Sequence, residues 1–182
     1  MQHTPQGPRV VLVTGASQGI GADVARQLEG TDAHVITADL FDETDVAALV
    51  DDVASRFGRL DTLVLNAYAM RLSRDAQRRL AELALPLMPA GGHIVYVTSH
   101  QAHFYPHKAV PKGSSAAVAS MRAGETALYA MRAEFDRAGI RFTVVSGDAN
   151  AAAFPSAIAK AATPPNPSGV VYVGSADYLM TA

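Results

Sequence analysis

The chain has 182 residues and a net charge of −2, and 49% of its residues are hydrophobic while 18% are charged. This balance suits one folded domain with a substantial core and excludes intrinsic disorder as the main state. The chain contains no cysteine, which excludes disulfide scaffolds, cysteine-ligated zinc, iron–sulfur clusters and thiol nucleophiles. A charge so close to zero provides no basic field for nucleic acid or an anionic membrane.

The first half of the chain alternates short apolar runs with segments of helical periodicity. Ile20, Val24 and Leu28 are four residues apart and share one helix face. Asp42 is a candidate N-cap for a following helix, and Gly58 lies just beyond its end. In chain order the predicted elements are a strand at 10–13, a helix from 20 to about 30, a strand at 34–38, a helix at 46–57 and a buried strand at 62–65.

The second half continues the same alternation. Gly139 is a clear stop signal for a long helix that begins at Ser114 or Ser115 and runs to Ala138. The helix near the end of the chain is alanine-rich and weaker in pattern. The predicted elements are a helix from about 71 to 85, a strand at 93–98, the long helix, a strand at 141–145, a helix at 151–161 and a strand at 170–173.

This alternation predicts an α/β fold with a doubly wound, mostly parallel sheet covered by helices on both faces. It is a Rossmann-like arrangement, and the sequence predicts a single domain over residues 1–182. No apolar run is long enough to cross a bilayer, and the polar first nine residues do not resemble a secretory signal. We therefore expect a cytoplasmic protein with no membrane partner.

The strongest local signal is the octapeptide Thr14-Gly15-Ala16-Ser17-Gln18-Gly19-Ile20-Gly21, between the first strand and the first helix. This glycine spacing in this context is the fingerprint of a dinucleotide-binding turn. The first glycine permits a tight turn, the second lets backbone amides approach a diphosphate, and the third allows close packing of the helix. The helix N-terminus adds a partial positive charge that faces the anion. The alternative is a glycine-rich turn without a ligand.

Asp39 ends the second strand, 24 residues after the first glycine of the turn. An acidic side chain at this place can accept hydrogen bonds from the adenosine ribose and repel a 2′-phosphate, which favours NAD over NADP. The alternative is a loop or helix-capping aspartate.

Together these segments resemble the short-chain dehydrogenase/reductase family. The glycine turn matches the family's T-G-x-x-x-G-x-G pattern, and Leu65-Asn66-Ala67-Tyr68 resembles its N-N-A-G motif with leucine and tyrosine substituted. Residues 92–99 resemble the strand that ends in the family's catalytic serine. Residues 120–150 resemble its long helix and following strand, with Ser146-Gly147 in place of Pro-Gly, and residues 170–174 resemble the closing strand.

The resemblance implies a hydride transfer between a nicotinamide cofactor and a carbonyl or alcohol carbon. It assigns Ser99 as the catalytic serine that orients the carbonyl. It also places a set of residues around the NAD(P) cofactor, with NAD favoured. The implied cofactor-binding residues are Gly15, Ser17, Gln18, Gly19, Ile20, Gly21, Asp39, Leu40, Asn66 and Ala67.

The catalytic Tyr-x-x-x-Lys pattern of the family is not intact. The alignment of the long helix places Ala117 at the tyrosine position and Met121 at the lysine position. Neither side chain can transfer a proton or carry a charge. Tyr105 and Lys108 are three residues apart in a predicted surface loop and do not reproduce the helical spacing. The chain is also shorter than expected, because only one helix fits between Asp39 and Asp61 where the family has two helices and an edge strand.

Three other kinds of chemistry have weaker support in the sequence. His100, His103 and His107 could be metal ligands, but they lack acidic neighbours and are predicted to form a polar loop, so no metal site is assigned. Ser99 and His100 could suggest a hydrolase, yet adjacent strand residues point to opposite faces. The arginines between residues 71 and 79 are predicted to form a solvated face, and no nucleic-acid partner is assigned.

Two functions follow from the sequence. The first is an oxidoreductase that acts on a small carbonyl or alcohol substrate. The second is a noncatalytic relative that binds NAD(P) as a sensor, scaffold or regulator. The family resemblance further implies a homodimer or homotetramer built on the long helix.

Overall fold

The computed structural model describes residues 7–40, 43–69, 73–165 and 169–174. Its centre is a six-stranded sheet in the order β2-β1-β3-β4-β5-β6, with every neighbouring pair parallel. The strands are β1 (Arg9–Thr14), β2 (Ala33–Ala38), β3 (Thr62–Asn66), β4 (His93–Ser99), β5 (Arg141–Gly147) and β6 (Gly169–Val173). The doubly wound α/β fold predicted from the sequence is confirmed, and the sheet is wholly parallel.

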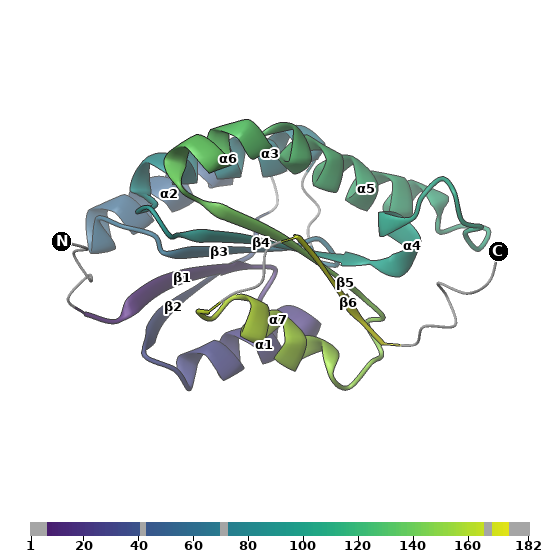
Figure 1. Ribbon diagram of the computed structural model, residues 1–182, viewed down its shortest axis with the longest axis horizontal. Coiled ribbons are helices and arrows are strands. Elements are labelled where there is room, and N and C mark those ends of the chain that lie inside the picture. Colours follow the sequence, from purple (N-terminus) through teal and green to yellow (C-terminus); the bar gives the residue numbers. More distant parts are fainter. Residues whose placement is uncertain (1–6, 41–42, 70–72, 166–168, 175–182) are drawn as a thin grey trace.

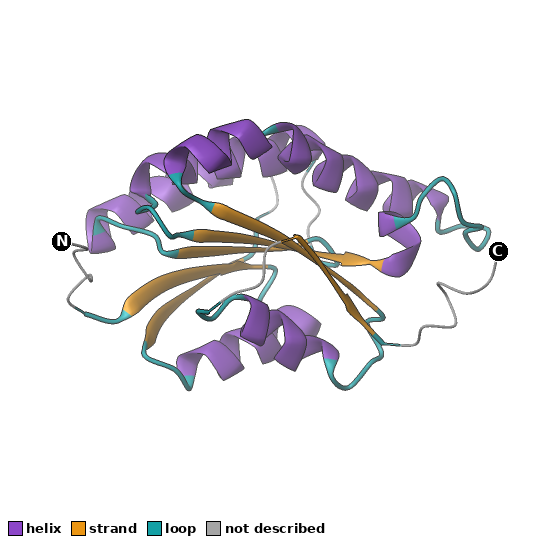
Figure 2. Cartoon of the chain, in the orientation of Figure 1, coloured by secondary structure: helices purple, strands orange, loops and turns teal. Residues whose placement is uncertain are grey.

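Helices cover both faces of the sheet, as Figures 1 and 2 show. One face carries α2 (Glu43–Phe57), α3 (Arg74–Ala84), α5 (Ser115–Ala130) and α6 (Arg132–Ala138). The other face carries α1 (Gly19–Glu29) and α7 (Phe154–Ala161). Two short turns, η1 (Leu85–Leu87) and α4 (His100–His103), complete the described elements. None of the helices in these residue ranges combines the length and hydropathy that a membrane span requires.

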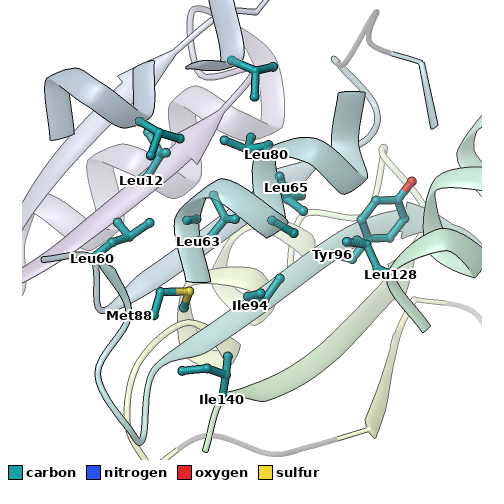
Figure 3. Close-up of a cluster of buried hydrophobic side chains, with 14 of the residues drawn as sticks. Leu12, Leu60, Leu63, Leu65, Leu80, Met88, Ile94, Tyr96, Leu128 and Ile140 are labelled. Carbon is teal, nitrogen blue, oxygen red and sulfur yellow. The ribbon is translucent and has the colours of Figure 1, made fainter. Parts of the chain in front are cut away.

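Two hydrophobic clusters hold these layers together. The larger lies under α2, α3, α5 and α6. Figure 3 shows part of it, including Leu12, Leu63 and Ile94 from three neighbouring strands and Leu80 and Leu128 from the helices. The smaller cluster packs α1 and α7 against the opposite face. Strands β1, β3 and β4 are apolar on both faces because helices cover both, which explains their continuous apolar runs.

The chain departs from the predicted elements at the long helix and at α4. The prediction of one continuous helix from Ser114 or Ser115 to Ala138 is wrong, because α5 ends at Ala130 and α6 begins at Arg132. At Met131 the backbone amide donates to the carbonyl of Leu128, three residues back, so the turn tightens where this fully buried methionine enters the core. The start predicted for the helix at 71, and the N-cap Asp42, lie outside the described residues. Ser73 caps α3 by accepting from the amide of Ala76 at 3.1 Å.

The other departure is α4, a one-turn helix where the sequence predicted a polar loop. Ser99 is its N-cap, and its hydroxyl accepts a hydrogen bond from the amide of Ala102 at 3.0 Å. His100 and His103 therefore lie on a helical turn that directly follows β4.

Candidate functional site

The carboxyl ends of the parallel strands meet at one edge of the sheet, and the turns that follow them form the candidate site. In an open α/β sheet this edge, near the point where strand order reverses, is where ligands bind. Here the reversal lies between β1 and β3, because β2 continues to one side of β1 and the later strands continue to the other.

The glycine turn after β1 is held tightly in place. Gly15 has φ +63°, and its amide donates to the carbonyl of Ala38 at 2.8 Å, which joins the turn to the end of β2. A Cβ on Gly15 would lie 2.5 Å from the Cβ of Ala69. A Cβ on Gly21 would overlap the carbonyl oxygen of Gly15. The positive φ of Gly15 fits the tight turn predicted for the first glycine, and the close approach at Gly21 fits the helix packing predicted for the third.

Asn66 connects β3 to this turn. Its side-chain amide donates to the carbonyl of Gly15 at 3.2 Å, and its backbone amide donates to the hydroxyl of Thr14 at 3.1 Å. The side-chain oxygen of Asn66 is buried and has no hydrogen-bond partner among the described residues. The asparagine thus has a structural role, fixing the turn, and retains one acceptor beside it.

The N-terminus of α1 has the features of an anion site. Gln18 is its N-cap in an extended conformation and makes no side-chain capping hydrogen bond, and no acidic residue lies in the first turn. Gly19 has φ +59°, and a Cβ built on it would meet nothing within 4 Å. The space before these amides is open, and the helix dipole points toward it. The residues present therefore fit the diphosphate of a dinucleotide.

Two adjoining cavities occupy this edge. The glycine-turn cavity has a volume of about 630 Å³, and the serine cavity, beside it, about 600 Å³. The glycine-turn cavity is lined by Gln18, Gly19, Ile20, Asp23, Asn66, Tyr68, Ala69, residues 149–152 and Pro155. The serine cavity is lined by Tyr68, Ser99, His100, Gln101, Gly113, Ser114, Ala117, Val118, Met121, Gly147 and residues 148–150.

Asp39, Leu40 and Ala67, which were also predicted to bind the cofactor, do not line the glycine-turn cavity. Asp39 is exposed, and its carboxylate accepts from the amide of Ser17 at 3.4 Å, so it lies beside the turn. Leu40 and Ala67 are buried and belong to the larger hydrophobic cluster. The structure therefore brings Asp39 to the turn, whereas the side chains of Leu40 and Ala67 pack in the core.

The serine cavity contains Ser99, Ala117 and Met121 together. Ser99 approaches from the end of β4, and the other two side chains come from the first turns of α5. The helical register predicted from the sequence thus places Ala117 and Met121 beside the serine. None of the described residues that line this cavity is a lysine or an arginine.

His100 lines the same cavity as Ser99, and the expectation that both belong to one strand is wrong. The strand ends at Ser99, and His100 already belongs to α4, where strand alternation no longer holds. The Nδ1 atom of His100 lies 2.7 Å from the hydroxyl of Ser146, and its Nε2 atom lies 2.9 Å from the carbonyl of Val173. Because a carbonyl only accepts, Nε2 donates and the imidazole is held as a structural group.

Tyr68 is a site residue that the sequence patterns did not identify. It follows β3 at the carboxyl edge and lines both cavities. Its hydroxyl donates to the carbonyl of Gly147 at 2.8 Å. Burial raises the pKa of the Tyr68 phenol well above its ordinary value, with a smaller contribution from the nearby Asp148 carboxylate, while a hydrogen bond with Ser99 acts in the opposite direction. The sequence feature that could have identified Tyr68 as a site residue is its position directly after Asn66-Ala67.

Neither Tyr105 nor His103 lines the serine cavity. Tyr105 lines a separate groove between α3 and α5, with Arg74, Arg78 and Arg122, and does not line the serine cavity. His103 pairs with the fully buried Glu125, with 2.7 Å between Nδ1 and Oε1. Over the described ranges, no three histidine, aspartate or glutamate side chains gather as a metal site would require.

The curated relatives of this chain are dehydrogenases and reductases. The chain is 30% identical over 191 aligned positions to 1-cyclohexenylcarbonyl-CoA reductase of Streptomyces collinus, an alignment that covers 80% of this chain and 66% of that one. Other curated relatives match over 28–34% of their own lengths. The chain therefore spans less than two thirds of the curated relatives it matches. A scan against models of protein families finds no match.

Solved structures show the same fold. A short-chain dehydrogenase from Burkholderia cenocepacia in complex with NADP superposes with a TM-score of 0.74 at 22% identity, covering 94% of this chain and 98% of that one. An NADH-dependent reductase complexed with NAD superposes with a TM-score of 0.73 at 18% identity, covering 92% and 95%.

Proposed function

The chain belongs to the short-chain dehydrogenase/reductase family, and on this basis we propose that it is an NAD(P)-binding oxidoreductase. The observation that carries the proposal is the uncapped N-terminus of α1, which opens through Gly19 into the glycine-turn cavity and adjoins the cavity of Ser99. A dinucleotide is long enough to need both compartments, since its diphosphate and its reactive ring lie at different places along the molecule.

The residues that would hold the cofactor are those of the glycine turn. The glycine turn would line the diphosphate, with the backbone amides at the N-terminus of α1 as the donors, and Asn66 would keep the turn in the required shape. Asp39, at the end of β2, would accept hydrogen bonds from the adenosine ribose and favour NAD over NADP. Leu40 and Ala67 would support this half of the site from the core.

When bound, the cofactor supplies the hydride chemistry, and the protein supplies position and polarity. The hydroxyl of Ser99 would orient the oxygen of a small carbonyl or alcohol substrate in the serine cavity. That hydroxyl is itself fixed, because its oxygen caps α4. A serine hydroxyl is a weak general acid, so Ser99 alone would position the substrate rather than protonate it.

A second candidate function has a specific observation in its favour. Ala117 and Met121 line the serine cavity at the places where the family pattern has a proton-transferring tyrosine and a lysine. A chain with these substitutions can bind NAD(P) without turnover and act as a sensor, scaffold or regulator. In either role we propose a cytoplasmic homodimer or homotetramer.

Fluorescence titration with NADH, followed by a screen of aldehydes and ketones for NADH consumption, tests the two functions. The oxidoreductase predicts saturable binding and turnover that falls strongly in Ser99→Ala while NADH affinity is retained. Binding without turnover across the panel supports the noncatalytic role. Absence of binding by folded protein contradicts both.

A further inference from the structure

Tyr68 stands on the boundary between the two cavities. Only Tyr68, Ala149 and Asn150 line both, among the residues that the structure describes, and Tyr68 has the largest side chain of the three. It follows β3, whereas its hydrogen-bond acceptor, Gly147, ends β5. Since β4 lies between these two strands, the side chain extends across the end of β4.

Three contacts hold the side chain in this position. The hydroxyl donates to the carbonyl of Gly147 at 2.8 Å, and the side chain of Ser99 interacts with the same hydroxyl. The ring packs edge-on against Phe154, with 5.9 Å between the ring centroids and 78° between the planes. Phe154 is fully buried and fits closely against Gly147, where a Cβ would lie 2.6 Å from the Phe154 ring. Tyr68 is therefore anchored at both its ring and its hydroxyl.

We propose that Tyr68 separates the glycine-turn cavity from the serine cavity and selects against ligands that extend through both. The inference rests on the proposed nucleotide-binding function. A ligand that ends at the diphosphate fits the glycine-turn side with Tyr68 in place. A complete dinucleotide can reach Ser99 only when the hydroxyl of Tyr68 leaves the carbonyl of Gly147 and the side chain turns away.

The separation has a chemical consequence for selectivity. ADP carries the diphosphate but no second nucleoside, so its binding does not require Tyr68 to move. NADH continues past the diphosphate, and its affinity is reduced by the free energy that holds Tyr68 against Gly147 and Phe154. Tyr68 is thus a specificity-determining residue that sets the ratio of NADH affinity to ADP affinity.

Calorimetric titration of the full chain with ADP and with NADH tests the proposal. Tyr68→Phe removes one hydrogen bond and keeps the ring, so we expect NADH to bind about fivefold more tightly. Tyr68→Ala removes the whole side chain, and the expected gain is on the order of tenfold or more. ADP affinity should change by less than about twofold in both variants. Tyr129→Phe, a half-buried tyrosine that packs on Phe142 instead, is the matched control and should leave both affinities unchanged.

The outcomes separate this proposal from the function on which it rests. Equal NADH affinity in wild type and variants, with ADP bound, overturns the role of Tyr68 and leaves the nucleotide site standing. Weaker NADH binding in Tyr68→Phe also overturns it, because the hydroxyl would then be a ligand contact. If neither ADP nor NADH gives a binding signal with wild type or any variant, both the nucleotide site and the proposed role of Tyr68 are overturned. If Tyr68→Ala is unfolded, Tyr68→Phe decides alone.

Discussion

Asp39 lies at the end of β2 with its carboxylate beside the amide of Ser17. A fixed negative charge at this place repels the 2′-phosphate of NADP and can accept hydrogen bonds from an unmodified ribose. We predict that Asp39→Ala weakens NAD binding and strengthens NADP binding, shifting the affinity ratio by about tenfold toward NADP. Titration of both dinucleotides into both proteins measures the ratio.

Asp32→Ala is a suitable control. Asp32 is exposed and lies just before β2, at the end of the strand opposite to Asp39. Unchanged affinity of Asp39→Ala for both dinucleotides would show that this carboxylate does not contact the ribose. The acceptor role would then fall to another group at the end of β2.

His93 gives the fold a defined sensitivity to acid. It is buried at the start of β4, with its Nε2 atom 2.8 Å from the hydroxyl of Thr143. Burial lowers the pKa of His93 to about 4, and the charge of Arg141 contributes in the same direction. The unfolded chain therefore binds a proton more readily than the folded chain. The contribution of His93 to the free energy of unfolding is fully present above about pH 6.5. It is lost as the pH falls toward 4, by at most about 1.4 kcal/mol per pH unit.

Urea unfolding between pH 7 and pH 4 measures this dependence. His93→Gln should flatten it, whereas His107→Gln, at an exposed position, should follow the wild-type curve. An identical decline in His93→Gln and wild type would assign the acid sensitivity to other groups.

At the scale of elements, the packing of α1 on the glycine turn depends on Gly21. A Cβ there would overlap the carbonyl of Gly15. We predict that Gly21→Ala lowers the free energy of unfolding by about 1–3 kcal/mol and abolishes ADP binding, because α1 must shift away from the turn. Chemical unfolding and calorimetry check the two effects.

Gly30→Ala, at the other end of α1, is the matched control. Gly30 has ordinary right-handed dihedral angles, and the methyl of an alanine there would lie 3.4 Å from the carbonyl of Gln27, so stability should change by less than about 0.5 kcal/mol. A Gly21→Ala protein as stable as wild type, with ADP affinity retained, would contradict the assigned role of this packing.

Elements with strong periodicity were predictable from the sequence. The apolar runs of β1, β3 and β4 predict strands because both faces are buried, and Gly58 and Gly139 mark real helix ends with positive φ. The break at Met131 was not predictable, since the apolar spacing continues through it and the tightened turn depends on tertiary packing. The helical turn α4 was missed because four residues are too few to show a period.

At the scale of the whole molecule, the sheet brings four separate turns to one edge. The glycine turn could be located from local spacing and strand context, whereas Ser99 was identified through the family resemblance. The position of the Tyr68 side chain could not be predicted, because it depends on Gly147, 79 residues away in the chain and two strands away in the sheet. The single helix between β2 and β3 was anticipated, and β2 is accordingly the last strand on its side of the described sheet.

The central claim is that a nucleotide diphosphate binds at the turn of residues 15–21. Hydrogen exchange of backbone amides, measured with and without saturating ADP, tests it most directly. We predict slower exchange in the peptides that contain residues 15–21, with smaller effects around Asn66 and residues 149–152. Unchanged exchange throughout, or protection confined to the groove between α3 and α5, would contradict it.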